Sequence, residues 1–521
     1  MRVTLKSCGS NLLHNLKIVL LFPPNWSAVV NSPHLALPLV AGALDEDYSL
    51  LEIWDLSKEF YDRNGSRPDN KLIIDACDNG NITLLDKLYF DWENYFIELA
   101  KDHKLEFGLI SGFYTKMITT FNYYYDKIKK GTVFSEFYNR YVYQKLKEID
   151  PILVGISISS ANQILPTIEL LIELRKILPK SKIVLGGNVV TRLSNSSEFN
   201  KVMNLADYVV LFQGERVIKK ICNSLIKVNS NTNHYKKIYS DEFIPITEWP
   251  IPVLHGLNLK DYLGIQTLPF VSTRGCYWGK CSFCAISAGW SRKGYSGSMT
   301  PDLMIKQIKH MVSKYKINRI KFVDETFPPS KVIPLSYLMN DNNLNIYWEA
   351  YVRLEPEWED ENFLRTAYNT GCRKLYFGLE LSPYSKRDCL HKNDNANIIT
   401  ILEVCKKIGI LVHLFCMVGH PETNETDANL TVKFLIDHQD KIDTADLVGF
   451  QLHRGISIKG IHPKKGQKET LSLTYEYKVN NGVALLLKEV QDLEKRCQER
   501  IWEEVPRLIH PLYRIGKSWK N

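Results

Sequence analysis

Hydrophobic and polar positions follow two alternating patterns along residues 1–235. Short apolar runs rich in β-branched residues predict buried strands, and the segments between them have the spacing of amphipathic helices. The expected strands are 17–22, 49–54, 152–157, 182–185 and 208–211. This order is typical of βαβ units, so we predict an α/β fold with a doubly wound parallel sheet whose ligand binds at the carboxyl ends of the strands.

A long segment at about 83–147 interrupts this order with a helical pattern that is rich in aromatic residues. These aromatics include Trp92, Phe113, Tyr123, Tyr124, Tyr125 and Tyr138. We interpret the insertion as a satellite hydrophobic core beside the sheet, and a lid over a ligand is the alternative.

A second alternating region occupies residues 266–445. It follows a stretch at 236–265 with three prolines, which we interpret as an interdomain linker. The expected strands of the second region are 270–273, 319–323, 347–352, 374–379 and 412–418. Helical patterns at 301–316 and 396–409 separate some of them, so we predict a partial β/α barrel with its site at the carboxyl ends of the strands.

The composition fits a chain of several globular domains. A length of 521 residues predicts roughly three domains. Hydrophobic residues make up 45% and charged residues 24%, and no apolar run approaches the roughly 20 residues of a membrane span. Disorder and an integral membrane protein are therefore excluded, and we expect no membrane partner. The last segment, 446–521, is expected to be a small C-terminal region with a charged helix over 482–505.

The net charge of +8 is spread thinly over the chain. Basic residues form no continuous stripe, and the clusters at 127–130 and 464–465 are short enough to be solvated faces. We therefore predict no nucleic-acid partner, with an RNA-binding protein as the alternative from a different functional class.

The 11 cysteines give the first indication of chemistry. An odd number without a visible signal peptide favours reduced thiols in the cytoplasm over a disulfide framework. Eight are scattered singly, whereas Cys276, Cys281 and Cys284 form a C-x4-C-x2-C array directly after an expected strand. Structural zinc normally takes four ligands. Three thiolates with one position open favour a four-iron, four-sulfur (4Fe–4S) cluster whose fourth iron binds a small molecule, and zinc is the alternative.

This array resembles the cluster-binding loop of the radical S-adenosylmethionine (SAM) enzymes. The resemblance implies that Cys276, Cys281 and Cys284 hold the cluster and that its open iron chelates SAM. It also implies that Phe283, just before the last cysteine, leans toward the adenine. The commonest family spacing is C-x3-C-x2-C, so the extra residue between the first two cysteines departs from that pattern.

Later segments at expected strand ends resemble the family's SAM-binding positions. The residues implied are Asp324 or Glu325 for the ammonium group, Arg353 for a carboxylate, and Glu380 and Ser382 for the ribose. The segment 415–422 resembles the part beside the adenine, although a histidine stands where the family usually has an apolar residue. The alternatives are an exposed strand end for the acidic pair and a surface ion pair for the arginine.

The N-terminal region resembles the cobalamin-binding Rossmann-like domain that precedes some radical SAM domains. Four segments carry this resemblance: the opening 21–38, the serine turn 157–159, the glycine pair with the residues after it, 184–191, and 206–215. The cobalamin contacts that it implies are Ser157, Ser159, Gly186, Gly187, Thr191, Gly214 and Glu215. A doubly wound sheet that binds nothing is the alternative.

The D-x-H-x-x-G sequence that supplies a histidine ligand to cobalt in other cobalamin enzymes is absent. His34 lies in the first loop between Pro33 and Leu35, and we interpret it as a packing residue. The resemblance therefore implies cobalt without a protein histidine.

Together these segments imply a cobalamin-dependent radical SAM methyltransferase. Such an enzyme uses a 5′-deoxyadenosyl radical and methylcobalamin to methylate an unactivated carbon or a phosphinate, here of a natural-product or peptide substrate. A cytoplasmic enzyme with an electron donor such as flavodoxin or ferredoxin is also implied. A cyclisation or rearrangement with the same cofactors is the alternative, and a cobalamin or redox sensor is a more remote one.

Overall fold

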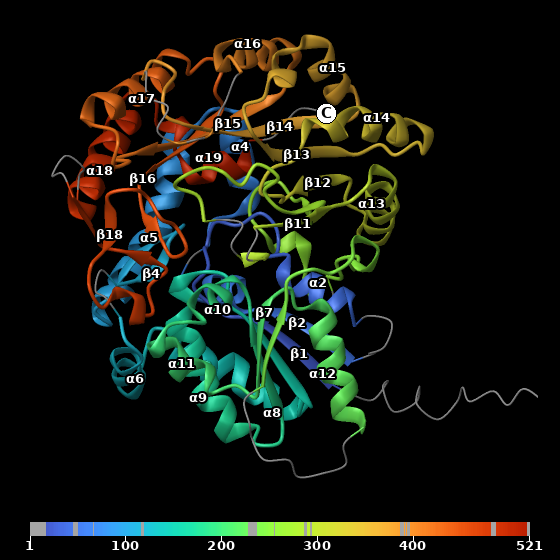
Figure 1. Cartoon of the computed structure of the whole chain (residues 1–521), viewed down its shortest axis with the longest axis vertical. Helices are drawn as coiled ribbons and strands as arrows, with labels where there is room; N and C mark the ends of the chain where they lie inside the picture. Colours follow the sequence, from blue (N-terminus) through green and yellow to red (C-terminus); the bar gives the residue numbers. More distant parts are fainter. Residues whose placement is uncertain are drawn as a thin grey trace, which may run out of the picture.

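The computed structural model describes residues 17–44, 50–65, 67–115, 119–227, 237–254, 256–285, 289–291, 294–385, 390, 392, 396–480 and 486–517. Within these residues the chain forms two six-stranded parallel sheets, one in each half of the sequence (Figure 1). In Figure 1 the N-terminal sheet lies in the lower half and the second sheet in the upper half. Residues that follow strands of both sheets line the same cavities, so the carboxyl ends of the two sheets face each other.

The N-terminal sheet has the strand order β2-β1-β5-β6-β7-β8, and every neighbouring pair is parallel. Its strands are β1 (Lys17–Phe22), β2 (Leu50–Asp55), β5 (Leu153–Ser157), β6 (Lys182–Gly186), β7 (Tyr208–Phe212) and β8 (Lys237–Asp241). Its helices are α2 (Ala36–Gly42), α3 (Leu56–Arg63), α9 (Ile164–Ile177), α10 (Asn188–Leu193), α11 (Ser197–Met203) and α12 (Glu215–Lys227).

Two hydrophobic cores cover the two faces of this sheet. Leu20 belongs to the core that contains Leu37 of α2 and Ile218 of α12. The next residue, Leu21, points to the opposite face and belongs to the core that contains Ile168 of α9. Successive side chains of one strand thus enter different cores, as both faces of a parallel sheet require. The expected doubly wound sheet is confirmed.

Strand β8 lies within the range that the sequence predicted as a linker, 236–265. It pairs only with β7 at the edge of the sheet, and most of its side chains are at least partly exposed. An exposed edge strand needs no run of apolar residues, so the hydrophobic pattern did not reveal it. The rest of the range holds two short 3-10 turns, η3 (Ile246–Glu248) and η4 (Leu259–Asp261).

The aromatic insertion packs against the N-terminal sheet. Its elements are α4 (Asn70–Asp78), α5 (Ile82–Asp102), β3 (Glu106–Gly108), β4 (Gly112–Tyr114), α6 (Phe121–Lys130), α7 (Ser135–Phe137), the π-helical turn η1 (Tyr138–Val142) and α8 (Tyr143–Ile149). Phe96 and Phe113 contact Phe60 of α3 at ring-centroid distances of 6.2 and 6.0 Å. The insertion therefore does not form a separate satellite core, because Trp92 and Phe113 belong to the same hydrophobic core as Leu21 of the sheet. The β3–β4 hairpin is an addition to the expected helices. Phe113 and Tyr124 also line a cavity, so the insertion walls a ligand site as well.

The second sheet has the order β16-β15-β14-β13-β12-β9, with parallel pairing throughout. Its strands are β9 (Leu268–Phe270), β12 (Arg319–Phe322), β13 (Tyr347–Val352), β14 (Cys372–Glu380), β15 (Leu411–Val418) and β16 (Thr444–Gly449). The intervening helices are α13 (Pro301–Tyr315), α14 (Val332–Asp341), α15 (Glu361–Asn369), α16 (Ile398–Ile408) and α17 (Glu425–Asp437). Neighbouring strands follow chain order and β9 and β16 lie at the two edges, which is the expected partial barrel.

The last part of the chain is not wholly helical. Two short antiparallel pairs, β17 (Leu452–His453) with β19 (Thr474–Tyr475) and β18 (Ile461–Pro463) with β20 (Tyr477–Val479), precede its helices. The helices are α18 (Leu487–Glu504) and α19 (Pro511–Gly516). Helix α18 packs on α17 and β16, whereas α19 packs on α4 and α5 of the N-terminal half. Within the described residues, no helix combines the length and apolar character needed to cross a membrane.

Candidate active site

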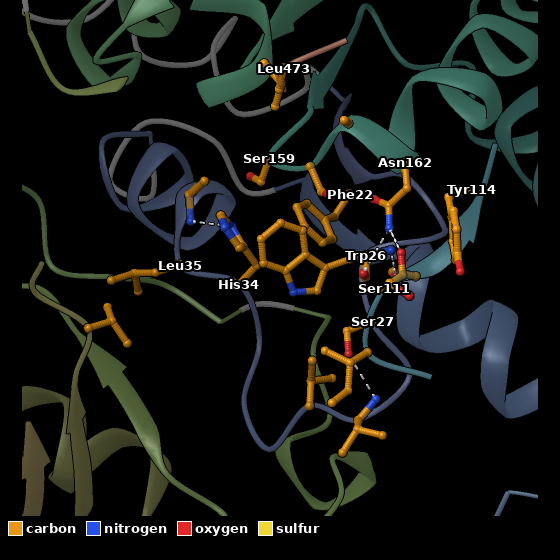
Figure 2. A pocket seen from close by; sticks show the side chains of 18 of the residues that line it. Phe22, Trp26, Ser27, His34, Leu35, Ser111, Tyr114, Ser159, Asn162 and Leu473 are labelled. Carbon is orange, nitrogen blue, oxygen red and sulfur yellow. Dashed lines mark hydrogen bonds between the residues drawn. The ribbon is translucent and has the colours of Figure 1, made fainter. Parts of the chain in front are cut away.

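Two adjoining cavities lie between the sheets. The large cavity, about 1070 Å³, is lined by loops of the N-terminal sheet, by the insertion and by the inner face of the second sheet. Figure 2 shows one wall of a pocket, where the rings of Phe22, Trp26 and His34 gather. The small pocket, about 300 Å³, lies at the carboxyl ends of β1, β5, β6 and β7. Trp26, His34 and Ser159 line both spaces, so the small pocket adjoins the large cavity.

The three cysteines follow β10 (Thr273–Gly275), a short strand that pairs with β11 (Tyr295–Ser298). Gly275 has a φ of +83°, and a Cβ atom there would lie 1.8 Å from the carbonyl oxygen of Gly294. Only glycine allows this close approach of the two strands. Beyond it, the amide of Cys284 donates to the carbonyl of Cys281 at 3.3 Å and tightens the loop.

The three thiols influence one another electrostatically. Burial raises the pKa of Cys281 to about 11, and the neighbouring thiols of Cys284 and Cys276 also raise it. The loop therefore gathers the three cysteines as the sequence predicted. Cys276 and Cys281 are partly exposed and Cys284 is exposed, so the thiols are accessible to a cluster.

These thiols fit a cluster that has several metal ions. Among the described residues, no three His, Cys, Asp or Glu side chains converge on a point that could hold a single metal ion. A 4Fe–4S cluster binds each thiolate to a different iron, so its cysteines surround the cluster and do not converge on one point. The three cysteines lie on one glycine-bearing loop and their thiols are at least partly exposed, as ligands of such a cluster need to be.

Two cations lie beside the cysteine loop. The guanidinium of Arg353 lies 4.1 Å from the ring of Trp278 and donates to the carbonyl of Lys392 at 2.7 Å. The ammonium of Lys392 lies 3.5 Å from Glu380 Oε1, and both cations lower the pKa of Cys281. Arg353 is buried, so the alternative of a surface ion pair is wrong. The structure thus brings Arg353 and Glu380 to the loop and adds Lys392, which the sequence did not single out.

The two carboxyl groups after β12 accept hydrogen bonds from the backbone just before the first cysteine. Asp324 accepts hydrogen bonds from the amides of Ser272 and Thr273 at 2.6 and 3.0 Å and from the Ser272 hydroxyl at 2.5 Å. Lys331 donates to the hydroxyl groups of Ser272 and Thr273 at 3.0 and 3.1 Å. Burial raises the pKa of Asp324, whereas Lys331 lowers it. Asp324 therefore anchors the start of the loop, which corrects the alternative of an exposed strand end.

Glu325 faces the other way, into the small pocket. It accepts hydrogen bonds from the amide of Gly275 at 3.1 Å and from the indole of Trp290. Burial raises its pKa to about 7. One carboxyl group therefore contacts the cysteine loop and also lines the pocket of the N-terminal sheet.

The remaining residues expected at the SAM site occupy different surroundings. Ser382 is buried in a turn, where its amide donates to Thr431 Oγ1 at 3.1 Å and its hydroxyl accepts from the amide of Tyr384 at 3.1 Å. Phe283 packs against the core that contains Met417 at the end of β15. His420, in the segment expected beside the adenine, is buried against Phe450, and burial lowers its pKa to about 4.

Backbone atoms and small side chains line much of the small pocket. Six of the predicted cobalamin contacts line it: Ser157, Ser159, Gly186, Gly187, Gly214 and Glu215. Gly187 has a φ of +106°, and a Cβ atom there would lie 2.4 Å from the carbonyl oxygen of Ile158. A larger residue would therefore displace the loop that ends β5, so the glycine keeps this side of the pocket open.

Thr191 and Glu215 act differently from the expectation. Thr191 is not among the described residues that line either cavity, and its hydroxyl accepts from the amide of Phe212 at 2.8 Å. Glu215 lines the pocket, but its carboxylate is held 2.6 Å from Nη2 of Arg274, whose side chain is fully buried. Arg274 also donates to Gln213 and lies 4.4 Å from the ring of Trp249. This ion pair joins the two halves of the molecule immediately before Cys276.

His34 is a packing residue, as the sequence indicated. Its ring stacks 4.8 Å from that of Phe22 and meets Trp26 edge-on at 5.1 Å (Figure 2). Its Nδ1 accepts from the amide of Ala36 at 3.3 Å, and burial lowers its pKa to about 4. His34 is therefore neutral at the boundary between the two cavities.

Comparison with protein families identifies a domain within the second half of the chain. Residues 270–435 match the family described as the radical SAM superfamily. The chain contains a radical SAM domain. This domain begins at β9 and includes the cysteine loop, so the 4Fe–4S cluster and SAM are its cofactors. No curated protein matches the sequence.

Solved structures resemble the chain over almost its whole length. One is a radical S-adenosylmethionine methyltransferase, TsrM, from Kitasatospora setae with tryptophan substrate and a SAM analogue bound. It has a TM-score of 0.55 and 12% identity, over 92% of this chain and 89% of that one. The same enzyme with cobalamin and a [4Fe–4S] cluster bound has a TM-score of 0.54 and 13% identity, over 95% and 89%. The radical SAM domain and the N-terminal sheet therefore share the overall fold of that enzyme.

Proposed function

We propose that the protein is a cobalamin-dependent radical SAM methyltransferase. The carrying observation is that the cysteine loop and the glycine-lined small pocket share Glu325, which contacts Gly275 and lines the pocket. The two proposed cofactor sites therefore adjoin each other, and the large cavity adjoins the small pocket through Trp26, His34 and Ser159. The fold shared with a methyltransferase whose structures hold cobalamin and the cluster supports this reading.

Each site has residues suited to its cofactor. Cys276, Cys281 and Cys284 would hold the cluster, and Arg353 and Glu380 offer a cation and a carboxylate to the charged groups of SAM. The small pocket would hold part of cobalamin. Strand ends and glycines line this pocket, and they leave room for a flat, bulky group.

When bound, the cluster supplies the electron that cleaves SAM, and cobalamin supplies the methyl group for a substrate radical. The chain's own task is to position both cofactors and to exclude water. Asp324 fixes the start of the cysteine loop, Trp26 and His34 separate the two spaces with aromatic rings, and the insertion covers the large cavity. An electron donor such as flavodoxin or ferredoxin is part of this proposal.

The variant Cys281→Ala tests the cluster assignment. After anaerobic reconstitution it is expected to lose the visible iron–sulfur absorption and all cleavage of SAM to 5′-deoxyadenosine, because one iron loses its ligand. Cys405→Ala is the matched control, since Cys405 is buried in a hydrophobic core, and it is expected to keep both. Retained SAM cleavage in Cys281→Ala would refute the assignment.

The mass of the product tests the reaction. Methylation adds one methylene unit to the substrate, and the methyl group carries label from methyl-labelled SAM. A product lighter by two hydrogens, or an unlabelled isomer, would instead establish cyclisation or rearrangement and overturn methyl transfer.

A further inference from the structure

The deep end of the large cavity carries a group of charged and aromatic side chains that the proposed cofactor sites do not use. We call these residues the cavity floor: Lys321, Tyr376, His413, Phe415, Asp446 and Arg514. They come from β12, β14, β15 and β16, with Arg514 supplied by α19. Such groups are expensive to bury in a barrel interior unless they are paired or bind a ligand.

The carboxylates near the floor already have cations of their own. Arg514 Nη1 lies 2.8 and 2.6 Å from the two oxygens of Asp446, and Lys321 Nζ lies 3.3 Å from Glu349 Oε1. Lys374 adds a further buried cation, which donates to the carbonyl of Arg514 at 3.3 Å.

The surrounding charges do not cancel this cation. Burial lowers the pKa of Lys374 to about 8, while Glu349 and Asp443 raise it. Arg319 adds another cation that interacts electrostatically with Glu349. Four cations, counting Lys321 and Arg514, thus face three carboxylates, so positive charge is in excess beneath the cavity.

His413 offers an unused polar atom at the same place. The residue is fully buried, and its Nδ1 is 2.8 Å from Thr444 Oγ1. Its Nε2 has no hydrogen-bond partner among the described residues, and Asp446 Oδ2 is 3.7 Å away. Burial, together with Lys374, Arg514 and Lys321, lowers its pKa well below the ordinary value. In the neutral tautomer whose Nδ1 accepts from Thr444, the Nε2–H of His413 lies on the side of Asp446, beneath the surface of the cavity.

Aromatic rings enclose the space above these groups. The ring of Tyr351 lies 4.8 Å from that of Tyr376 and 5.9 Å from that of Phe415, and the rings of Tyr351 and Phe415 are stacked at an interplanar angle of 22°. Phe22 and Trp26, from the N-terminal half, also line this cavity (Figure 2). Flat apolar walls above a positive, donor-bearing floor suit a small molecule with an aromatic or similarly flat body and one anionic end.

We propose that the cavity floor is a binding site for the anionic group, a carboxylate or a phosphate, of a flat small-molecule substrate. Lys321 and Arg514, whose side chains are partly accessible in the cavity, donate to the anion, and Tyr351, Tyr376 and Phe415 contact the body. In calling this ligand the substrate, the inference rests on the proposed function.

Equilibrium dialysis of the reconstituted holoenzyme tests the site with three probes that share one ring. The probes are 4-fluorophenylacetate, the neutral 4-fluorophenylacetamide and 4-fluorobenzyl phosphate. At least one anion is expected to bind about tenfold more tightly than the amide, because hydrogen bonds to a charged group are the stronger ones. The tighter of the two anions identifies the group that the floor accepts.

Variants of Lys321 test whether the preference for an anion over the amide depends on the cavity floor. Lys321→Met is expected to lose about tenfold in anion affinity with little change for the amide. The double variant Lys321→Met/Glu349→Gln also removes the carboxylate that pairs with Lys321, so the fold is expected to be retained. It is expected to bind the anions less tightly than the parent, because the ammonium of Lys321 no longer donates to them. Lys433→Met, on the exposed face of α17, is the control and is expected to bind all probes as the parent does.

The outcomes separate this inference from the proposed function. Equal affinity of the amide and both anions, no binding of any probe, or an unchanged preference in both Lys321 variants would overturn the anion site. SAM cleavage measured on the same preparations reports on the proposed function alone. Active SAM cleavage without an anion preference would reject the site, whereas an anion preference without SAM cleavage would reject the radical SAM function.

Discussion

The carboxyl group of Glu325 lies between the two proposed cofactor sites. It accepts from the amide of Gly275 on one side and lines the small pocket on the other. Burial raises its pKa from 4.5 to about 7, so the folded protein holds this proton at pH values where the unfolded chain has released it. Its charge state therefore changes close to neutral pH, beside the loop that carries the cysteines.

This shift predicts how stability depends on pH. The folded state binds more protons than the unfolded state between pH 4.5 and about 7, so Glu325 makes unfolding easier as the pH rises through this range. The loss approaches about 3 kcal/mol at most. Glu325→Gln keeps an acceptor for Gly275 and is expected to flatten the fall in melting temperature between pH 5 and about 7.5.

The control for this measurement is Glu499→Gln, because Glu499 is an exposed residue of α18. It is expected to follow the parent at every pH. If Glu325→Gln and the parent lose melting temperature in parallel, the protonation of Glu325 does not contribute to stability in this range.

For single residues, the sequence predicts which side chains lie at a site better than it predicts their hydrogen-bond and ion-pair partners. The three cysteines follow one another on a single loop, and Gly187 lines the small pocket. Glu325, expected at the ammonium group of SAM, instead contacts Gly275 and lines the small pocket. Glu215 was expected to meet a cofactor, yet its carboxylate pairs with Arg274, because an arginine 59 positions later in the chain lies against the same pocket. Such a pairing depends on how two domains meet, and neither local pattern nor spacing records it.

At the scale of elements, the loop between β6 and α10 determines the shape of the small pocket. Gly187 has φ and ψ of +106° and 171°, a conformation that only glycine adopts readily. Gly187→Ala is therefore expected to destabilise the protein by more than about 1 kcal/mol and to lower the cobalamin retained after desalting.

Gly80→Ala serves as the comparison for that variant. Gly80 also has a positive φ, +64°, but a Cβ atom there meets nothing within 4 Å. Its variant measures the cost of the backbone conformation alone and is expected to retain cobalamin normally. Equal cobalamin retention in the two variants would contradict the role of Gly187 in the pocket.

The elements that the sequence predicted are those with a strong apolar pattern. Strands β1 and β13 match their expected ranges, since their residues are largely buried. Strand β8 was missed because it is an exposed edge, and the short pairs around β17 and β18 were missed because two or three residues carry no periodicity. Strand β16 crosses position 445, where the sequence predicted the end of the barrel domain.

At the scale of the whole molecule, Arg274 and Glu215 connect the two halves. Arg274→Met would leave Glu215 buried without its cation, which typically costs about 3–5 kcal/mol. We expect a lower melting temperature and faster proteolysis between the halves of the chain. The double variant Arg274→Met/Glu215→Gln removes both charges and is expected to recover most of the loss, as a double-mutant cycle would record. Independent, additive losses would show that the pair does not couple.

Helix α19 comes late in the sequence but packs into the hydrophobic core of the N-terminal half. Its residues Leu512 and Tyr513 belong to the same hydrophobic core as Val19 of β1, and Arg514 from the same helix reaches the cavity floor. During synthesis, the face of α4 and α5 that receives this helix stays uncovered until more than 400 further residues have been made. The N-terminal half therefore completes its hydrophobic core only after the strands of the barrel have been synthesised. The cavity floor likewise lacks Arg514 until α19 has been made.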